Sequence, residues 1–244
     1  MDNAIYTMIT RQSGLTRELS SIANNVANMS TTGFKGEHGV FSEYVRQLET
    51  GRGHPQAGGS LSMGRLGGHA TDFSDGGLAS TGAPLDLAIT GEGFFQVQTP
   101  QGTRLTRAGH FMLDADRILV DPMGNAVTDT GGGEIAVPQD ATDIRVGRDG
   151  TISADGIEYG RVGVFTADPQ TLERDGDNLW RAPVTTLVDE PTISSGFLEQ
   201  SNVNPVLEMS RMIEVQRFYD AGQSLMDLED ERIRSVARTI RQMG

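Results

Sequence analysis

The sequence predicts an α+β fold, mainly β in its core, in which a discontinuous coiled-coil domain from both chain ends accompanies a central antiparallel β-domain. Three observations predict this class. Apolar residues recur every seven residues near both termini, short apolar runs separated by turn residues fill the middle, and 31 glycines and 9 prolines among 244 residues indicate many turns. We expect residues 1–35 and 203–244 to form the helical assembly domain, residues 36–77 a glycine-rich linker and residues 78–202 the β-domain.

The first helix is predicted from Asp2, which suits an N-cap, to about Asn28, where residues 30–33 (Ser-Thr-Thr-Gly) end it. Side chains at alternating three- and four-residue spacing along it are apolar except for Gln12. Such a stripe is typical of a helix that packs lengthwise against other helices. Its apolar members are Ile5, Met8, Leu15, Leu19, Ile22, Val26 and Met29.

Residues 36–77 are rich in glycine and show little periodicity. A structureless stretch of this length is unusual inside a compact domain. The sequence therefore favours a linker or a loop that orders on assembly, and a flexible excursion of the chain is the simpler alternative.

Residues 85–195 carry the β pattern. Leu85, Leu87 and Ile89 alternate with their neighbours, and residues 91–93 (Gly-Glu-Gly) turn the chain into the next apolar run. Later apolar runs lie at residues 95–97, 105, 111–113, 118–120, 144–146, 162–165 and 179–180, and turn pairs at Asp149-Gly150, Asp155-Gly156 and Asp175-Gly176. Short strands at this close spacing predict antiparallel sheets rather than βαβ units.

The last helix is predicted from Asn204, which suits the N-cap, with Pro205 at the first helical position and Glu208 in the first turn. Apolar residues recur every seven positions at Met212, Tyr219, Met226, Ile233 and Ile240. A helix that continues to residue 243 is about 58 Å long, more than a β-domain of this size can cover. We therefore expect it to pack against the first helix and neighbouring subunits. A simple hairpin of the two helices within one chain is the alternative.

Composition excludes several classes of function. A formal charge of −13 argues against nucleic acid or an anionic membrane as partner. The absence of cysteine excludes disulfides, Cys-ligated zinc and thiol nucleophiles. The first 30 residues show no pattern of a cleavable secretory signal, and no apolar run reaches the roughly 18 residues of a membrane-spanning helix.

Motifs for catalysis or ligand binding are also missing. The four histidines show no metal-ligand spacing, and neither a nucleophile elbow nor a phosphate-binding loop occurs. The segment 91–93 is too short for a dinucleotide fingerprint, and residues 175–178 lack the rest of a calcium-binding loop. We expect no catalytic residue, cofactor, metal or small-molecule substrate, and we interpret Arg107 as a salt-bridge or interface residue of the β-domain.

Residues 23–35 (Ala-Asn-Asn-Val-Ala-Asn-Met-Ser-Thr-Thr-Gly-Phe-Lys) closely resemble the N-terminal motif of the flagellar rod, hook and hook-associated axial proteins. Blocks in the centre and before the last helix are similar to two further motifs of that family, in the same order. The residues that carry the resemblance are Asn24, Asn25, Asn28, Thr32, Gly33 and Phe34, then Leu85, Asp86, Gly91, Gly93, Phe94 and Arg107, and finally Asn202 and Asn204.

The resemblance implies a structural, non-enzymatic subunit of the bacterial flagellar basal-body rod. Such subunits leave the cell unfolded through the flagellar export apparatus, without a cleaved signal peptide. In the periplasm they join other rod subunits in a tubular drive shaft that transmits torque for motility, with the terminal helices inside and the β-domain outside. The opening residues and the modest length most resemble the proximal-rod members. A distal-rod or hook subunit is the alternative within the family.

The predicted assembly interface consists of the periodic apolar residues of both helices. They are Ile5, Met8, Leu15, Leu19, Ile22, Val26, Met212, Tyr219, Met226, Ile233 and Ile240. Gln12, Gln216 and Gln223 are candidates for fixing the register between helices, because an unpaired buried amide is unfavourable. Two other classes remain as alternatives, a secreted enzyme that acts on the cell wall and a surface-binding module that oligomerises through a coiled coil.

Overall fold

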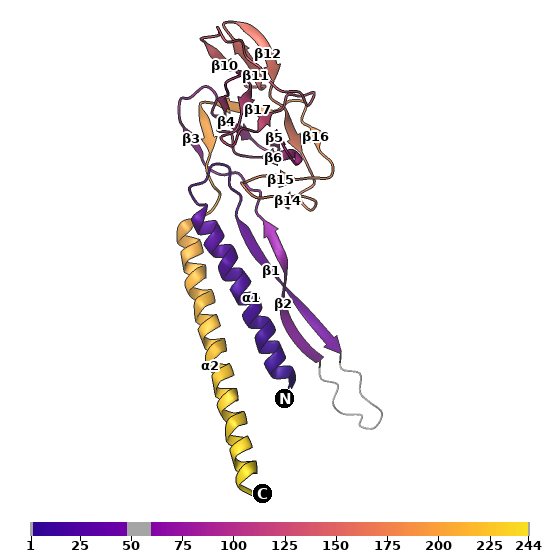
Figure 1. Cartoon of the computed structure of the whole chain (residues 1–244), viewed down its shortest axis with the longest axis vertical. Helices are drawn as coiled ribbons and strands as arrows, with labels where there is room; N and C mark the ends of the chain where they lie inside the picture. The colour runs from indigo at the N-terminus through magenta and orange to yellow at the C-terminus, as the bar shows by residue number, and fades with distance from the viewer. Residues whose placement is uncertain (1, 48–59, 244) are drawn as a thin grey trace. The chain divides into compact units, whose positions relative to one another are not determined.

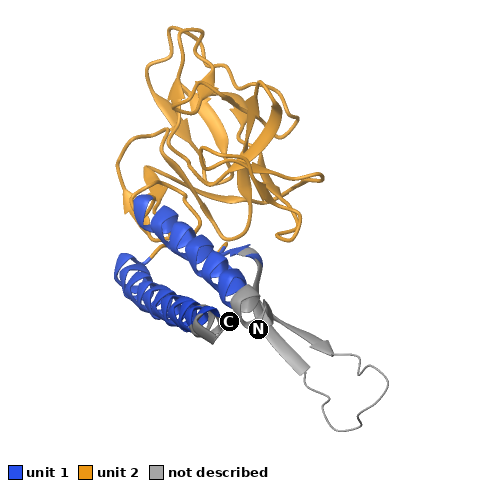
Figure 2. Ribbon diagram, turned by 60° about the horizontal axis from the view of Figure 1, so that its bottom comes forward, with its two compact units in different colours: residues 1–27, 37–72, 204–244 blue, residues 28–36, 73–203 orange. Residues whose placement is uncertain are grey.

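The computed structural model describes residues 2–47 and 60–243, and side chains for residues 8–40, 68, 70–235, 238 and 241. It confirms the α+β class, with an N-terminal helix, a C-terminal helix and antiparallel β-structure between them. The chain forms two compact units (Figure 2): unit 1 comprises residues 1–27, 37–72 and 204–244, and unit 2 comprises residues 28–36 and 73–203. Residues 28–35, which the sequence grouped with the helical assembly domain, lie in unit 2.

The two helices of unit 1, α1 (Asp2–Ala27) and α2 (Pro205–Met243), lie side by side in opposite directions (Figure 1). The predicted N-cap of α2 is confirmed, since Asn204 Oδ1 accepts hydrogen bonds from the amides of Val206 at 3.0 Å and Leu207 at 3.3 Å. The helices have 26 and 39 residues. The last dozen or so residues of α2 therefore extend past the start of α1, by about 20 Å at the helical rise.

The described parts of the glycine-rich segment, where a linker was expected, pair as two antiparallel strands, β1 (Glu37–Gln47) and β2 (Ser60–Thr71), with a register shift between Val40 and Phe41. Hydrogen bonds to α1 hold the start of β1: Ser21 Oγ donates to the Glu37 carbonyl, and Asn25 both donates to that carbonyl and accepts from the Glu37 amide. Glycines weaken the apolar alternation by which strands are found in a sequence, but they do not prevent ladder pairing.

Unit 2 is built of short antiparallel strands. The first nine are β3 (Leu78–Ser80), β4 (Leu87–Thr90), β5 (Phe94–Thr99), β6 (Gly102–Thr106), β7 (Met112–Leu113), β8 (Leu119–Val120), β9 (Ala126–Val127), β10 (Ile144–Val146) and β11 (Thr151–Ala154). The others are β12 (Ile157–Arg161), β13 (Val164–Thr166), β14 (Glu173–Arg174), β15 (Trp180–Arg181), β16 (Thr186–Leu187), β17 (Thr192–Ser195) and β18 (Phe197–Glu199).

The main sheet of unit 2 has the strand order β14-β15-β6-β5-β9-β8-β7, and β13 joins it through β5 and pairs with β16. Strands β10, β11 and β12 form a second sheet, while β17 pairs with β4 and β18 with β3. The predicted turn at Asp155-Gly156 joins β11 to β12 with φ angles of 51° and 85°, as a type I′ turn requires.

Two apolar clusters form the core of unit 2. The larger one includes the fully buried Leu87, Phe95, Val97, Leu119, Val127, Ile152 and Val162. The smaller one includes Phe94, Leu105, Phe165 and Trp180, and the ring of Phe73 meets those of Phe94 and Trp180 edge-on at 5.8 and 5.1 Å. Trp180, the single tryptophan of the chain, is 1% exposed and therefore reports on the folding of unit 2 alone.

Candidate assembly interface

The contact between α1 and α2 uses the predicted periodic residues. Leu15 and Ile22 of α1 and Val215 of α2 are buried in its centre, with exposed fractions of 7%, 3% and 6%. Each such side chain contributes about 1.5–3 kcal/mol when it leaves water. Half-buried side chains around them are Leu19, Val26, Met212 and Tyr219. Val215, which the seven-residue series omits, lies between two of its members and completes a three- and four-residue spacing.

The other predicted interface residues are not part of this cluster. Met8 and Met226 are half-buried, and Ile233 is 43% exposed. The side chains of Ile5 and Ile240 lie outside the described residues. The seven-residue series of α2 thus begins in the contact with α1, at Met212 and Tyr219, and reaches a solvent-exposed position at Ile233.

Gln12, the polar interruption of the first stripe, contacts α2 beside Tyr219 and Gly222. Its Nε2 donates to the Tyr219 carbonyl at 2.9 Å. A Cβ on Gly222, the glycine of α2, would lie 2.7 Å from Gln12 Oε1, so a larger residue there would require the end of the Gln12 side chain to shift. The predicted register role of Gln12 has this hydrogen bond in its favour, whereas Gln216 and Gln223 are exposed.

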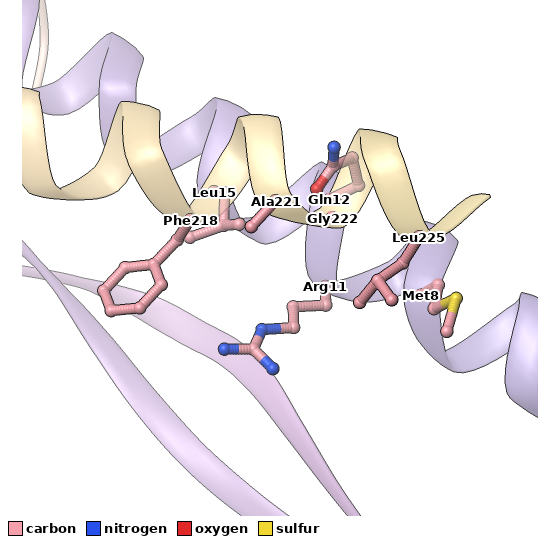
Figure 3. Close-up of a pocket in the computed structure, with 8 residues that line it drawn as sticks. All are labelled: Met8, Arg11, Gln12, Leu15, Phe218, Ala221, Gly222 and Leu225. Atoms are coloured by element: carbon pink, nitrogen blue, oxygen red, sulfur yellow. The ribbon is translucent and has the colours of Figure 1, made fainter. Parts of the chain in front are cut away.

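A groove of about 330 Å³ runs between the helices beside this contact (Figure 3). Its walls are mainly apolar, and Phe218 and Leu225 on its rim are 50% and 53% exposed. The residues that line it are Met8, Arg11, Gln12, Leu15, Phe218, Ala221, Gly222 and Leu225. An apolar groove with large exposed side chains is a surface on which another helix can pack.

Polar groups flank the apolar contact. Burial raises the pKa of the Glu18 carboxyl, Arg211 lowers it and Glu214 raises it. A raised pKa means that the folded state binds this proton more tightly, so the helix pair loses stability at this position as the pH rises and the carboxyl ionises, and regains it on acidification.

Asn25 of the N-terminal motif connects three elements of unit 1. It is 1% exposed and, besides its two hydrogen bonds to Glu37 of β1, donates from Nδ2 to Glu208 Oε2 of α2 at 3.2 Å. Glu208 is itself buried, and its other carboxylate oxygen lies 3.9 Å from His38 Nδ1. Asn24, its neighbour in the motif, is exposed.

The second half of the same motif packs into unit 2. Gly33 has a φ of 65°, and a Cβ there would lie 2.4 Å from the backbone of Arg107. Its amide donates to the Glu199 carbonyl at 2.7 Å. Phe34 is buried beneath the guanidinium of Arg174, which stacks on it at 4.7 Å and on Trp180 at 4.5 Å. Asn28 and Thr32 contribute hydrogen bonds at 3.1 Å with Thr31 and 2.9 Å with Asn178.

A buried ionic network joins this segment to the end of the β-domain. Glu199 Oε1 lies 2.6 Å from Lys35 Nζ, and Glu199 Oε2 lies 3.1 Å from Arg107 Nη1. All three residues are at most 3% exposed. The Gly76 amide also donates to Glu199, and Arg107 Nη2 donates to the Gly91 carbonyl. Arg107 is therefore a salt-bridge residue of the β-domain, as predicted.

The remaining motif residues have structural roles in unit 2 or cap α2. Asp86 is buried against His110, with Oδ1 and Nδ1 2.6 Å apart, and Leu85 packs on the larger core. A Cβ on Gly93 would lie 2.6 Å from Val164. Asn202 Oδ1 accepts from the Gly36 amide at 2.8 Å, which ties the two connecting segments together.

Gly76→Ala is expected to destabilise unit 2 by about 1–3 kcal/mol, as overpacking does. A Cβ there would lie 1.9 Å from the Gln200 carbonyl oxygen, so backbone must move and the hydrogen bond to Glu199 is strained. At Gly77 the nearest atom is the end of the Gln200 side chain at 3.4 Å, an ordinary contact, so Gly77→Ala is the matched control. Urea unfolding followed by Trp180 fluorescence measures both, and equal midpoints would contradict the prediction.

Sequence reasoning did not identify Glu199 or the buried state of Lys35. Glu199 ends a three-residue strand and has no periodic neighbour, and its partners are 92 and 164 residues away. One signal in the sequence was Lys35, which follows Phe34 within the motif. A lysine is rarely buried unless it is paired, so a lysine in a segment that packs on the core implies a buried acidic partner.

Among the described residues, no group of three or more histidine, cysteine, aspartate or glutamate side chains is arranged to hold a metal ion. No helix in the described part of the chain combines the length and apolar character needed to span a membrane.

Comparisons with known proteins agree with these motifs. Residues 5–35 match the model "Flagella basal body rod protein", residues 88–154 match "Flagellar hook protein FlgE/F/G D1 domain" and residues 194–239 match "Flagellar basal body rod FlgEFG protein C-terminal". The chain is 40% identical to the flagellar basal-body rod protein FlgF of Caulobacter vibrioides, with 98% of each chain covered. It is 33% identical both to FlgF of Mesorhizobium japonicum and to FlgG of Bacillus subtilis, over 97% of this chain and 98% of each relative.

Proposed function

Because this chain belongs to the flagellar basal-body rod protein family, as a structural subunit and not an enzyme, we propose that it polymerises through its terminal helices in the proximal part of the rod. The rod assembles from this subunit and other rod subunits. The 40% identity to FlgF of Caulobacter vibrioides, against 33% to FlgG of Bacillus subtilis, favours the proximal position over the distal one.

The exposed apolar surface of α2 is the observation that carries the assembly proposal. Leu207, Phe218, Leu225 and Leu228 are between 50% and 63% exposed, although α1 already covers another side of the helix. A single chain gains nothing from these side chains, whereas packing with helices of neighbouring subunits buries them. The seven-residue periodicity of both helices fits coiled-coil packing in the assembled rod.

The site of assembly that we propose is the periplasm, reached as an unfolded chain through the flagellar export apparatus and without cleavage of a signal peptide. The family supports this proposal, and a chain without cysteine is suited to an oxidising compartment because it cannot form wrong disulfides.

The proposal is tested by deleting the gene for this chain and expressing an epitope-tagged copy in its place. We expect the deletion strain to lack swimming and the tagged copy to restore it and to be recovered in the rod of purified basal bodies. Swimming without any copy, or recovery outside the rod, would contradict the proposal. A peptidoglycan-hydrolysis assay with the purified chain tests the enzyme alternative, and we expect no activity.

A further inference from the structure

A second regular stripe of side chains runs along α2, away from the residues that pack on α1. Met212, Val215 and Tyr219 face α1. At about 100° per residue, positions two residues after Val215 and five residues after it lie on the other side of the helix. From there a three- and four-residue spacing selects side chains that are all exposed: Arg217, Asp220, Ser224, Asp227, Glu231, Arg234, Arg238 and Arg241. We call these residues the outer stripe.

The charge of the outer stripe reverses along the helix. Its middle carries Asp227 and Glu231 one turn apart, and its end carries Arg234 and Arg238 one turn apart. Like charges at this spacing destabilise an isolated helix. Arg234 lies 2.7 Å from Asp230, but both side chains are largely exposed, so this pair contributes little and is easily exchanged. Both blocks of like charge become favourable when an oppositely charged surface covers them.

A second copy of the same helix supplies that surface when it lies parallel and is displaced by two heptads, which is about 21 Å along the axis. Each residue of one copy then lies beside the residue fourteen positions later in the other, at the same heptad position. Three pairs of opposite charges then meet along the outer stripe, Ser224 lies beside Arg238, and no like charges meet. The pairs are Asp220 with Arg234, Asp227 with Arg241 and Arg217 with Glu231.

Other whole-heptad displacements do not give this match. Without displacement every charge of the outer stripe faces its own kind. One heptad sets Asp220 against Asp227 and Arg234 against Arg241, which offsets the two opposite pairs it makes (Asp227 with Arg234, Glu231 with Arg238). Three heptads make one like pair, Arg217 with Arg238, and one opposite pair, Asp220 with Arg241. Like charges placed opposite one another discriminate against these arrangements. The pattern therefore selects one displacement.

We propose that α2 docks through the outer stripe on α2 of a second copy of this chain, in parallel and displaced by two heptads. The inference rests on the proposed function and names one neighbour of the helix. The occupant is a second copy because a single stripe contains both halves of the complementary pattern. The parallel arrangement uses different halves on the two copies and so continues into an open polymer, whereas an antiparallel contact closes into a dimer.

Engineered disulfides test the displacement directly, because the chain has no cysteine of its own. Asp220→Cys and Arg234→Cys copies are produced together in cells that lack the native chain, and purified basal bodies are oxidised. Within one helix these positions are about 21 Å apart, far beyond the roughly 7 Å between Cα atoms that a disulfide spans. A disulfide between them must therefore join two copies.

We expect a cross-linked dimer when both variants are present and none when either is present alone. Dimers from one variant alone would show an in-register or antiparallel contact and overturn the proposal. So would the absence of dimers from basal bodies that contain both variants. Absence of the chain from otherwise complete basal bodies would instead overturn the proposed function.

Charge reversal gives an independent test in swimming cells. Asp220→Arg and Arg234→Asp each place like charges together, and the double variant restores the pair with its signs exchanged. We expect each single variant to lose swim-zone diameter and the double variant to recover it. Asp116→Arg, an exposed change of the same charge in unit 2, is the matched control and should swim normally. A double variant no better than the single ones would overturn the proposal.

Discussion

Glu199→Ala is expected to unfold unit 2 at a much lower urea concentration than the native chain. The change leaves the Lys35 ammonium and the Arg107 guanidinium buried without their shared carboxylate, which is 2.6 and 3.1 Å away in the native structure. Removing one partner of a buried ion pair costs about 3–5 kcal/mol. The free energy of unfolding of a domain is only about 5–15 kcal/mol, so the urea concentration at the midpoint of unfolding should fall by a large fraction. Trp180 fluorescence of the full chain measures it.

The matched control is Glu173→Ala, which removes a carboxylate from an ion pair with Arg181 at the surface of the same unit. The two side chains are 67% and 59% exposed, so we expect a change of at most about 1 kcal/mol. Equal midpoints for Glu199→Ala and Glu173→Ala would show that the buried network does not hold the segment 28–36 on the β-domain.

Ile22→Asp is expected to abolish swimming and to leave the unfolding of unit 2 unchanged. Ile22 is 3% exposed in the contact between α1 and α2, so the change removes about 1.5–3 kcal/mol of apolar burial. It also places a carboxylate among apolar side chains, which costs more still. The helices should separate, and with them the surface that we propose for assembly.

Swim-zone diameter in soft agar measures the first effect, and Trp180 fluorescence in urea measures the second. Ile157→Asp is the control of the same chemistry, because Ile157 lies in unit 2 and is 59% exposed. We expect it to swim normally. Normal swimming of Ile22→Asp, or a shifted unfolding midpoint of unit 2, would show that the helix pair does not act as an independent assembly element.

The elements that could be predicted from the sequence are those whose cause is local. Asn204 and Pro205 determine the start of α2 through capping, and Asp155-Gly156 determines a hairpin turn through its positive φ angles. The periodic residues around Ile22 likewise identified the face of α1 that packs on α2. In each case the signal lies within a few residues of the feature.

The features that were missed have distant causes. The hairpin of β1 and β2 depends on pairing between Glu37 and Thr71, across a glycine-rich sequence without alternation. The segment 28–35 was grouped with the helical assembly domain because its motif is continuous with the first helix, but its second half is held by Glu199, far along the chain. Local periodicity contains no information on such contacts.

The network of Lys35 and Glu199 also has a kinetic consequence. It joins residues 164 positions apart, near the first and last segments of unit 2. Closing so long a loop costs chain entropy before any contact is gained, and topologies dominated by such contacts fold slowly. A chain delivered progressively from either end cannot complete this unit until both segments have emerged. The order of the sequence therefore makes completion of unit 2, with this network formed, a late event.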